Sequence, residues 1–433
     1  MPRYDTDILI IGAGAAGLAA ARELSGAGRR AIVLEARGRI GGRIHTLHLP
    51  DSPVPIELGA EFVHGEVDTT FSIIEAAALT AIELPDTHHW SRNGKWETIG
   101  DFWERIDKVR RQIGNLARDV SFDEFLRSKR SLSPRLRELS RTFVEGYHAA
   151  HADRISALAL KSADSEQEQD DPSGNKQFRI ANGYDALIAW LRAGLDPGRV
   201  ELRLGTVVSE IRWGANDVTL VCRSNGREET LRARAALITV PIGVLKAPRD
   251  QEGAIRFDPP LREKEKAIAG LEAGHVVKIA FRFRERFWDE RPLPFNFLHT
   301  SDRFMPTWWS SAPVRAPLLT GWAGGHAADA LLAEGRETMI DRALDAMSAA
   351  FAIPRRRLDA LLGATYTHDW QADPYSRGAY SYAAVGGSGA HDTLARPLRG
   401  TLFFAGEATS ADQTGTVAGA IESGRKAARA LKK

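Results

Sequence analysis

Short apolar runs alternate with stretches of mixed polarity along the chain, and the runs near the N-terminus are continuous. Residues 7–11, apolar from Ile8 onward, and residues 31–34 form two such runs, and residues 18–24 between them have the spacing of a helix. Continuous apolar runs are typical of strands that are buried on both faces of a parallel sheet. This order predicts a βαβ unit at the start of the chain.

Similar runs return in the middle and at the end of the chain. Strands are predicted at residues 200–204, 207–211, 218–222 and 235–240. The last of these is continuously apolar, so we expect it to rejoin the first sheet. Residues 401–409 predict a strand followed by a polar loop, and residues 416–425 predict a final helix.

A different strand pattern alternates between apolar and other side chains. Residues 275–283 alternate with a period of two, which places the apolar side chains from Val277 to Phe283 on one face and Lys278 on the other. The remaining segments predict a hairpin at residues 90–96, helices within 101–161, a strand at 321–323 and one or two helices within 327–351.

Sheet segments at the start, middle and end of the chain are separated by two long insertions. We therefore predict a discontinuous cofactor-binding domain from residues 1–80, 199–250 and 381–433. Residues 81–198 and 251–380 are predicted to form a second, substrate-binding domain.

The composition excludes several classes of partner. Of the 433 residues, 43% are hydrophobic and 26% are charged, with a net charge of +2. The mixed charges give no basic face for nucleic acid, and no apolar stretch approaches the roughly 18 residues that span a membrane. The first strand leaves no room for a signal peptide, and the single Cys222 cannot form an intramolecular disulfide. We expect a cytoplasmic protein that binds neither nucleic acid nor membrane.

The turn after the first strand carries the chemistry. It reads G-A-G-A-A-G, with Gly12, Gly14 and Gly17 at the glycine positions, and Glu35 closes the second strand. Such a turn brings backbone amides and a helix N-terminus to a pyrophosphate, while the acid binds a ribose. The pattern predicts a bound dinucleotide, either FAD or NAD(P).

Two later segments extend this prediction. Glycines precede Arg43 within residues 38–44, which favours a second phosphate contact because a guanidinium matches phosphate oxygens. The small residues Gly59 and Ala60 offer a place where a flat ring could press against the backbone.

Together these blocks resemble the flavin-containing amine oxidase family, which includes monoamine oxidases, polyamine oxidases and the oxidase domain of histone lysine demethylases. The resemblance rests on residues 12–17 with Glu35, 41–43, 57–60, Lys278 on its strand, and 404–409 with the final helix. It implies an α/β fold: a discontinuous Rossmann-like FAD-binding domain of the GR2 type, plus an α+β substrate-binding domain with a mixed sheet and helices. We expect a bacterial member.

The resemblance also implies FAD that is held noncovalently, because Ala379 stands where monoamine oxidases carry the cysteine that links the flavin. It places Glu35 at the adenosine ribose, Val208 at the adenine and Glu407 at the ribityl chain. The full set of residues that it implies for the cofactor is Gly12, Gly14, Ala15, Ala16, Gly17, Glu35, Ala36, Arg37, Gly42, Arg43, Gly59, Ala60, Glu61, Val208, Pro241, Trp370, Gly406, Glu407, Thr416 and Val417.

For catalysis the resemblance implies Lys278, Trp370, Tyr380 and His64. Lys278 would hold a water over the flavin, Tyr380 would form one wall of an aromatic cage, and His64 would lie beside the substrate amine. Thr416 stands where the second cage tyrosine is found in monoamine oxidases, so a one-sided cage is expected. A helix that begins near Thr416 would direct its positive end at the flavin.

The implied reaction is the oxidation of an amine. A hydride passes from the α-carbon to flavin N5, the imine hydrolyses to an aldehyde or ketone, and O2 reoxidises the flavin to give H2O2. The alternatives are an L-amino acid oxidase or desaturase of the same fold, an NAD(P)-linked reductase, and a flavin-binding scaffold without turnover.

Other features stay open at this point. His148 and His151 have a metal-compatible spacing on a predicted helix, but no third ligand is evident and no metal is expected. The acidic residues 164–171 favour a solvated loop, with attraction of cationic amines as the alternative. Glu61, Trp308 and Trp309 have no settled role. The amine, the physiological acceptor and the oligomeric state, with a homodimer as one option, are also undetermined.

Overall fold

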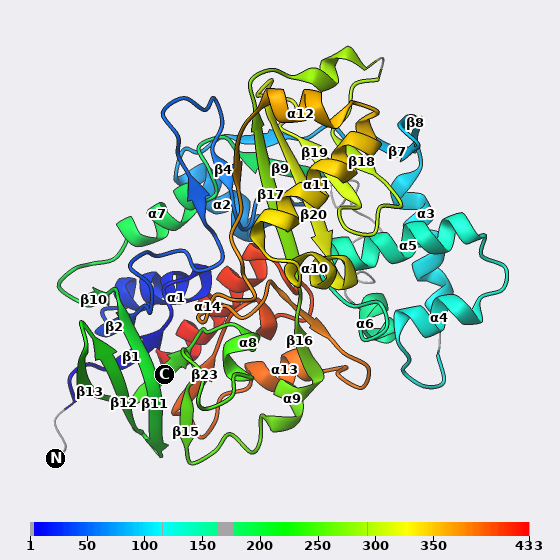
Figure 1. Ribbon diagram of the computed structural model, residues 1–433. Coiled ribbons are helices and arrows are strands. Elements are labelled where there is room, and N and C mark those ends of the chain that lie inside the picture. Colours follow the sequence, from blue (N-terminus) through cyan, green and yellow to red (C-terminus); the bar gives the residue numbers. More distant parts are fainter. Residues whose placement is uncertain (1–3, 115, 163–175, 292, 433) are drawn as a thin grey trace.

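The computed structural model describes residues 4–114, 116–162, 176–291 and 293–432. Figure 1 shows a sheet near the two termini and a second, larger sheet on the opposite side of the molecule, each with its own helices. Both sheets border the cavity that is described below. The fold is therefore α/β, with a Rossmann-like part and an α+β part that contains a mixed sheet.

The first sheet is parallel and brings together segments from the whole chain. Its order is β10 (Val200–Arg203), β2 (Ala31–Leu34), β1 (Ile8–Ile11), β14 (Ala235–Ile238) and β23 (Leu402–Phe404). All side chains of the three central strands are buried, as the continuous apolar runs predict. The prediction that residues 235–240 rejoin the first sheet is confirmed.

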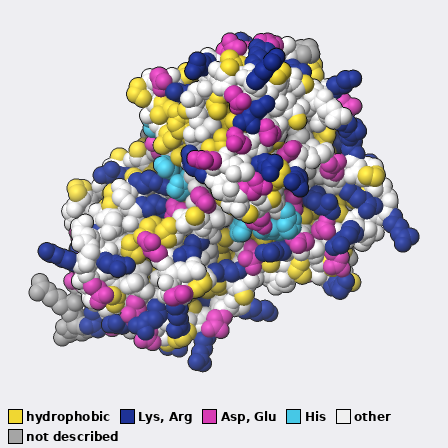
Figure 2. Space-filling view, in the orientation of Figure 1, with side chains coloured by type: hydrophobic (Ala, Val, Ile, Leu, Met, Phe, Trp, Pro, Cys, Tyr) yellow, Lys and Arg dark blue, Asp and Glu magenta, His cyan; other side chains and the backbone are white. Residues whose placement is uncertain are grey.

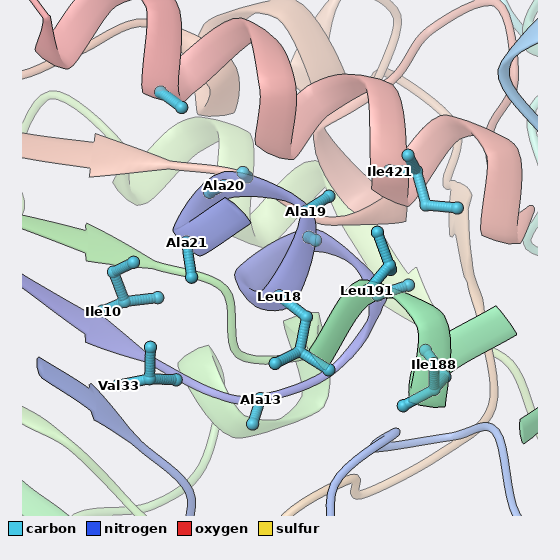
Figure 3. Packing of buried hydrophobic residues seen from close by; sticks show 14 of the residues in the cluster. Ile10, Ala13, Leu18, Ala19, Ala20, Ala21, Val33, Ile188, Leu191 and Ile421 are labelled. Atoms are coloured by element: carbon cyan, nitrogen blue, oxygen red, sulfur yellow. The ribbon is translucent and has the colours of Figure 1, made fainter. Parts of the chain in front are cut away.

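Helix α1 (Ala15–Gly26) covers one face of this sheet and packs against α14 (Val417–Leu431) and α7 (Asp185–Ala193). Figure 3 shows Leu18 of α1 beside Ile188 of α7, with Ile421 of α14 on the other side of α1. The helices approach closely because their contact residues are small. A Cβ on Gly424 of α14 would lie 2.2 Å from the backbone oxygen of Ala16.

A four-stranded sheet covers the other face of the first sheet. Its order is β13 (Arg227–Ala233), β12 (Asp217–Ser224), β11 (Thr206–Gly214) and β15 (Arg256–Asp258). Cys222 is buried in β12 and has no disulfide. Strand β13 was missed by the sequence prediction because its polar side chains, such as those of residues 227–230, hide the alternation.

The larger sheet has seven strands and is mixed. Strand β18 pairs with β7 in parallel, and all other strand pairs of this sheet are antiparallel. Its order is β21 (Leu362–Tyr366), β17 (Val276–Phe283), β20 (Leu318–Gly324), β19 (Thr307–Ser310), β18 (Phe297–His299), β7 (His88–Arg92) and β8 (Lys95–Thr98). The predicted hairpin is β7 and β8. The apolar face of β17 packs on α10 (Gly325–Leu332), α11 (Arg336–Phe351) and α12 (Arg355–Leu361).

The remaining elements complete the two parts. A helical group follows β8 and consists of α3 (Phe102–Arg110), η1 (Arg111–Ile113), α4 (Phe122–Ser128), α5 (Pro134–Tyr147) and α6 (Ala157–Ser162). The short strands are β3 (Thr46–Leu47), β4 (Ile56–Glu57), β5 (Val63–His64), β6 (Ala81–Glu83), β9 (Gln177–Ile180), β16 (Leu271–Ala273) and β22 (Ser381–Ala383). The short helices are α2 (Asp68–Ala76), α8 (Ile242–Leu245), α9 (Glu265–Gly270), η2 (Phe287–Glu290), α13 (Ala390–Ala395) and η3 (Glu407–Thr409).

The prediction that His148 and His151 lie on one helix is wrong. His148 and His151 do not share a helix, because α5 ends at Tyr147, His148 is its C-cap and Ala149 has a φ of 53°. A residue in this left-handed conformation turns the chain out of the helix.

Other predictions are not decided by the structure. Helix α7 lies in the segment 81–198 assigned to the second domain, yet it packs in the core around α1, so the domain boundaries stay predictions. The acidic residues 164–171 lie outside the described residues. Among the described residues, no helix is long and apolar enough to cross a membrane.

Candidate active site

The carboxyl ends of the parallel strands open into a cavity of about 1230 Å³. Gly12 follows β1, Glu35 follows β2, Pro241 follows β14 and Gly406 follows β23, and all four line this cavity. Ligands of open parallel sheets bind at this edge, where loops leave the strands in opposite directions. The same cavity continues to the face of β17 that carries Lys278.

The cavity gathers nearly all the residues that the sequence predicted for the site. Those that line it are Gly12, Gly14, Ala15, Ala16, Glu35, Ala36, Arg37, Gly42, Arg43, Gly59, Ala60, Glu61, His64, Val208, Pro241, Lys278, Trp370, Tyr380, Gly406, Glu407, Thr416 and Val417. Gly17 is the exception. A Cβ there would lie 1.9 Å from Gly12 O, so Gly17 lets α1 pack against the turn.

The glycine turn leaves room for an external group. Gly14 precedes α1 as its N-cap, and a Cβ built on it would meet one heavy atom within 4 Å, Gly41 O at 4.0 Å. Packing within the protein therefore does not require glycine at this position. The first amides of a helix have no partners within it and favour an anion. The open space beside Gly14 and the first amides of α1, which we call the Gly14 cradle, thus fits a diphosphate such as that of FAD.

Glu35 is fixed at the end of β2 by backbone amides. Its Oε2 accepts from Ala13 N at 2.8 Å and its Oε1 from Arg37 N at 3.0 Å. Each carboxylate oxygen can accept a second hydrogen bond, so the carboxylate can still bind a ribose diol. The Arg37 guanidinium pairs with Asp373, with Nη2 2.6 Å from Oδ1, and its Nη1 lies 3.8 Å from Glu35 Oε1.

Arg43 and Glu407 form an ion pair in the cavity wall, with Nη2 2.9 Å from Oε1. The other carboxylate oxygen of Glu407 accepts from the Ser381 hydroxyl at 2.7 Å, and Arg43 also donates to Ala379 O. The sequence predicted both residues for the cofactor, but it did not predict that they pair with each other. Arg43 thereby joins the glycine loop to the segment before β22.

Lys278 lies at the base of the cavity and is 4% exposed. Its ammonium donates to Gly59 O at 3.0 Å and lies 2.7 Å from Glu61 Oε2. The alternation in β17 explains this position, because the neighbours Val277 and Ile279 point into the core on the other face. The predicted opposition of Lys278 to the apolar face is confirmed.

Glu61 is held by more than Lys278. Its Oε1 accepts from Arg179 Nε at 2.8 Å and from Trp309 Nε1 at 3.0 Å. Burial raises the pKa of Glu61, but the charges and hydrogen bonds of Lys278 and Arg179 outweigh it and leave the pKa below its ordinary value. Glu61 is therefore a carboxylate. The sequence analysis missed Arg179, whose signal is a charged residue in the alternating strand β9.

A second carboxyl group lies close to this pair. Burial raises the pKa of Glu57 to about 7, although the Thr46 hydroxyl and Tyr184 N donate to the carboxyl at 2.6 and 2.7 Å. A group with this pKa exchanges its proton near neutral pH. Glu57 was not among the predicted site residues.

Aromatic side chains enclose the part of the cavity next to Lys278. The Tyr380 hydroxyl donates to Tyr147 O at 2.6 Å, and the Tyr147 ring lies 5.4 Å from the ring of His64. Trp322 lies 5.8 Å from Trp309 and donates to Gly146 O. The sequence predicted Tyr380 and His64 here but missed Tyr147 and Trp322, which come from α5 and β20.

His64 lacks a hydrogen-bonding partner among the described residues, and its ring packs against Phe62 and Tyr147. Burial lowers the pKa of His64 to about 4. The imidazole is therefore neutral at pH 7 and can donate or accept one hydrogen bond inside the cavity.

Trp370 closes the cavity beside Gly59. Its indole nitrogen donates to Leu58 O at 3.0 Å, and a Cβ on Gly59 would lie 3.2 Å from the indole and 1.8 Å from Arg43 O. Only glycine fits at position 59, which leaves a flat wall of backbone and indole.

The final helix begins at the cavity. Thr416 is its N-cap, and the threonine hydroxyl accepts from Gly419 N at 2.9 Å. This arrangement fixes the start of a helix whose positive end faces the cavity. The expectation that a helix begins near Thr416 is confirmed.

Comparisons with known proteins show which proteins the chain is similar to. The family model described as "Flavin containing amine oxidoreductase" matches residues 15–432. The chain is 28% identical to lysine-specific histone demethylase 1B of Mus musculus over 97% of its own length and 52% of the demethylase. It thus spans about half the length of that relative.

Two further comparisons cover most of both chains. The chain is 32% identical to polyamine oxidase 2 of Arabidopsis thaliana, over 99% of this chain and 88% of the relative. The structure of cyclohexylamine oxidase from Brevibacterium oxydans IH-35A matches with a TM-score of 0.82 at 22% identity, over 99% of both chains. At that identity the structural match shows the fold.

Proposed function

The chain belongs to the flavin-containing amine oxidoreductase family, and from this premise we propose that it is an FAD-dependent amine oxidase. Membership makes the chain a flavoprotein and an oxidoreductase. The observation that carries the finer proposal is the single cavity in which the Gly14 cradle, the buried Lys278 and an aromatic enclosure meet.

The chain's own residues would hold FAD along the sheet edge. The start of α1 and Gly14 would face the diphosphate, Glu35 the adenosine ribose, and the flat wall at Gly59 and Trp370 the flavin ring. Binding would be noncovalent with respect to cysteine, because the single Cys222 is buried in β12.

When bound, FAD supplies the redox chemistry: it accepts a hydride from the carbon that bears the amine nitrogen and returns the electrons to O2 as H2O2, while the imine hydrolyses to an aldehyde or ketone. The protein supplies position and environment. Tyr380, Tyr147 and Trp322 would exclude water and orient the substrate carbon. The charged Lys278, balanced by Glu61, would hold a water at the base of the cavity.

His64 would contact the substrate nitrogen. Its low pKa keeps the imidazole neutral, so it does not repel an incoming ammonium group, and it can accept a hydrogen bond from the amine. No side chain in this scheme acts as a strong base, which suits a reaction that begins from the neutral amine.

The charges of the cavity favour amines over amino acids. The basic side chains Arg37, Arg43 and Lys278 line the described part of the cavity, and each is paired with a carboxylate: Asp373, Glu407 and Glu61, respectively. A substrate carboxylate would need a guanidinium that is not already neutralised. This observation weighs against the L-amino acid oxidase alternative.

The experiment that tests the function is anaerobic mixing of the holoenzyme with a panel of cyclic monoamines, arylalkylamines, polyamines and amino acids. The flavin absorbance at about 450 nm is followed, and air is then admitted for a peroxide assay. Bleaching by an amine followed by peroxide release supports the proposal. A flavin that no amine bleaches would refute it and favour the desaturase or scaffold alternatives.

A further inference from the structure

A cluster of ligand-type side chains lies outside the cavity, where the start of β17, helix α10 and the segment after α5 meet. The cluster consists of His151, His275 and Asp329, and we call it the His-Asp cluster. His151 Nε2 lies 2.7 Å from one Asp329 oxygen, and His275 Nδ1 lies 2.5 Å from the other. Their ligand atoms all lie within 4.8 Å of one another.

The three residues come from three separate segments. His151 follows α5, His275 precedes β17, and Asp329 lies on α10. Figure 2 shows histidine side chains gathered on the visible face close to the place that α10 occupies in Figure 1. The sequence analysis expected no metal because no third ligand was evident beside His151. The fold supplies it from positions more than a hundred residues away in the chain.

A fourth ligand is within reach. His326 precedes Asp329 on α10 by three residues, so both project from the same side of the helix. The His326 ring centroid lies 4.8 Å from that of His151, and its Nε2 lies 3.0 Å from Asp153 Oδ1. A rotation of this exposed side chain would turn the imidazole toward the cluster.

His151 Nε2 donates to the Asp329 carboxylate in this structure, so a zinc ion that binds Nε2 would replace the Nε2 proton. His151 Nδ1 lies 3.2 Å from the Tyr382 hydroxyl, which can accept or donate. A proton on Nδ1 would leave the Nε2 lone pair free to bind an ion. Ligating histidines commonly bind such a second partner through the other ring nitrogen, which fixes the tautomer.

Solvent reaches the His-Asp cluster from the side of Asp329 and His275. His151 is 2% exposed, whereas the side chains of Asp329 and His275 are 41% and 38% exposed. An ion could therefore enter from solvent and meet a buried imidazole. Imidazole and carboxylate ligands suit zinc, and three or four of them complete a tetrahedral site.

We propose that the His-Asp cluster binds one zinc ion, with His326 or water as the fourth ligand. Ligand atoms around tetrahedral zinc lie about 3.3 Å apart at the usual bond lengths. The two contacts of the cluster are hydrogen-bond distances and must open by several tenths of an ångström, which the exposed Asp329 carboxylate permits. The ion would connect His275, three residues before Lys278, to α10 and to the segment after α5.

The site is structural in this proposal, so the test measures metal and stability rather than activity. The FAD-loaded protein is treated with a chelator, dialysed against zinc sulfate and analysed for bound metal and thermal midpoint. We expect one zinc per chain and a higher midpoint than in the chelated sample. Cobalt(II) is added to a second sample, where visible absorption bands typical of tetrahedral coordination are expected.

Substitutions in the His-Asp cluster test whether these residues bind the zinc ion. Asp329→Asn and His275→Gln should each lower zinc affinity by 10-fold or more, on the order expected for loss of a ligand or its partner. His48→Gln is the matched control, because His48 forms a surface pair with Asp185 at 2.9 Å without a second histidine. It should leave zinc binding unchanged.

Two results would overturn the proposal. One is a chelated protein that takes up no zinc or cobalt at the cluster, which would make the cluster a hydrogen-bonded link between α10 and its neighbours. The other is zinc that binds equally to wild type and both cluster variants. Flavin absorbance in each sample shows whether a variant is folded, and the cobalt spectrum of the unsubstituted protein does not depend on any variant.

Discussion

Lys278 and Glu61 form a buried ion pair at the base of the cavity, with 2.7 Å between Nζ and Oε2 and side chains that are 4% and 10% exposed. Two basic groups share this one carboxylate, because Arg179 Nε lies 2.8 Å from its other oxygen. The carboxylate thus keeps two cations in place below the predicted flavin position.

Glu61→Gln should therefore destabilise the protein. Loss of the carboxylate leaves the buried Lys278 and the partly buried Arg179 without their counter-charge, and we expect a loss of about 3–5 kcal/mol in the free energy of unfolding. Urea denaturation of the FAD-free protein measures it. Lys278→Met in the same chain should restore part of the loss, because one uncompensated charge is removed. If the two substitutions add without coupling, the pair does not stabilise the fold as described.

The glycine turn offers a test that separates cofactor binding from folding. Gly14→Ala meets no close atom in the protein, so the variant should fold, but its methyl group would occupy the cradle and we expect FAD affinity to fall by about 10-fold or more. Fluorescence titration of the apoprotein with FAD measures the affinity.

Gly26→Ala serves as the control on the same helix, since a Cβ there has nothing within 4 Å. It should leave FAD affinity unchanged and raise the free energy of unfolding by a few tenths of a kcal/mol, up to about 1 kcal/mol. Equal FAD affinities for the two variants would argue against a diphosphate at Gly14.

Local patterns in the sequence explain which of these features could be predicted. The parallel strands, the glycine turn with Glu35 and the position of Lys278 follow from the order and period of residues within short segments. The start of α1 was placed three residues late, because Ala15–Gly17 read as part of the turn.

Long-range pairings could not be predicted in the same way. Arg179 meets Glu61 across 118 positions, and Asp329 meets His151 across 178. Nothing in either segment identifies its partner, because the contact depends on how the insertions fold against the sheet. Tyr147 was missed for the same reason, since helical periodicity does not show which residue at the end of α5 reaches the cavity.

His64 should make the protein sensitive to acid. Its pKa is about 4 in the folded protein and about 6.5 when unfolded, so the unfolded chain binds the proton first as the pH falls. The contribution of His64 to stability should therefore be constant above pH 6.5 and fall between pH 6.5 and 4, by at most about 1.4 kcal/mol per pH unit. The raised pKa of Glu57 acts in the opposite direction up to about pH 7, so the contribution of His64 is the difference between wild type and a His64 variant. Urea denaturation at several pH values measures the slope.

His64→Gln should make this slope shallower, because glutamine does not titrate. Part of the slope will remain, since burial also lowers the pKa of His45 to about 4 and that of His148 to about 3. The exposed His48 provides the control, and His48→Gln should preserve the slope of the wild type. An unchanged slope in His64→Gln would mean that His64 is solvated.

Trp308 and Trp309 lie on opposite faces of β19. Trp308 is fully buried in the core against α11, and Trp309 lines the cavity and donates to Glu61. Trp309→Phe removes a hydrogen bond to a carboxylate, so we expect kcat/KM for the best amine to fall about 10-fold. Trp308→Phe should lower the free energy of unfolding by about 1–3 kcal/mol with kcat/KM unchanged. Steady-state kinetics and urea denaturation of both variants distinguish the roles, and equal kinetic effects would contradict the assignment.

The paired cations of the cavity predict discrimination between an amine and its α-carboxylated counterpart. Arg37, Arg43 and Lys278 are each neutralised by a carboxylate, so a substrate carboxylate would enter a desolvated space without a free guanidinium. For the amine that reduces the flavin fastest, we expect the matching L-amino acid to react at least about 100-fold more slowly in anaerobic stopped-flow mixing.

The amide of that amino acid separates charge from size, because it fills nearly the same volume without the negative charge. If charge decides, the amide should react much faster than the acid. If amide and acid react equally slowly, the limit is the shape of the aromatic enclosure around Tyr380. An amino acid that reacts as fast as the amine would mean that one of the three ion pairs opens to bind it.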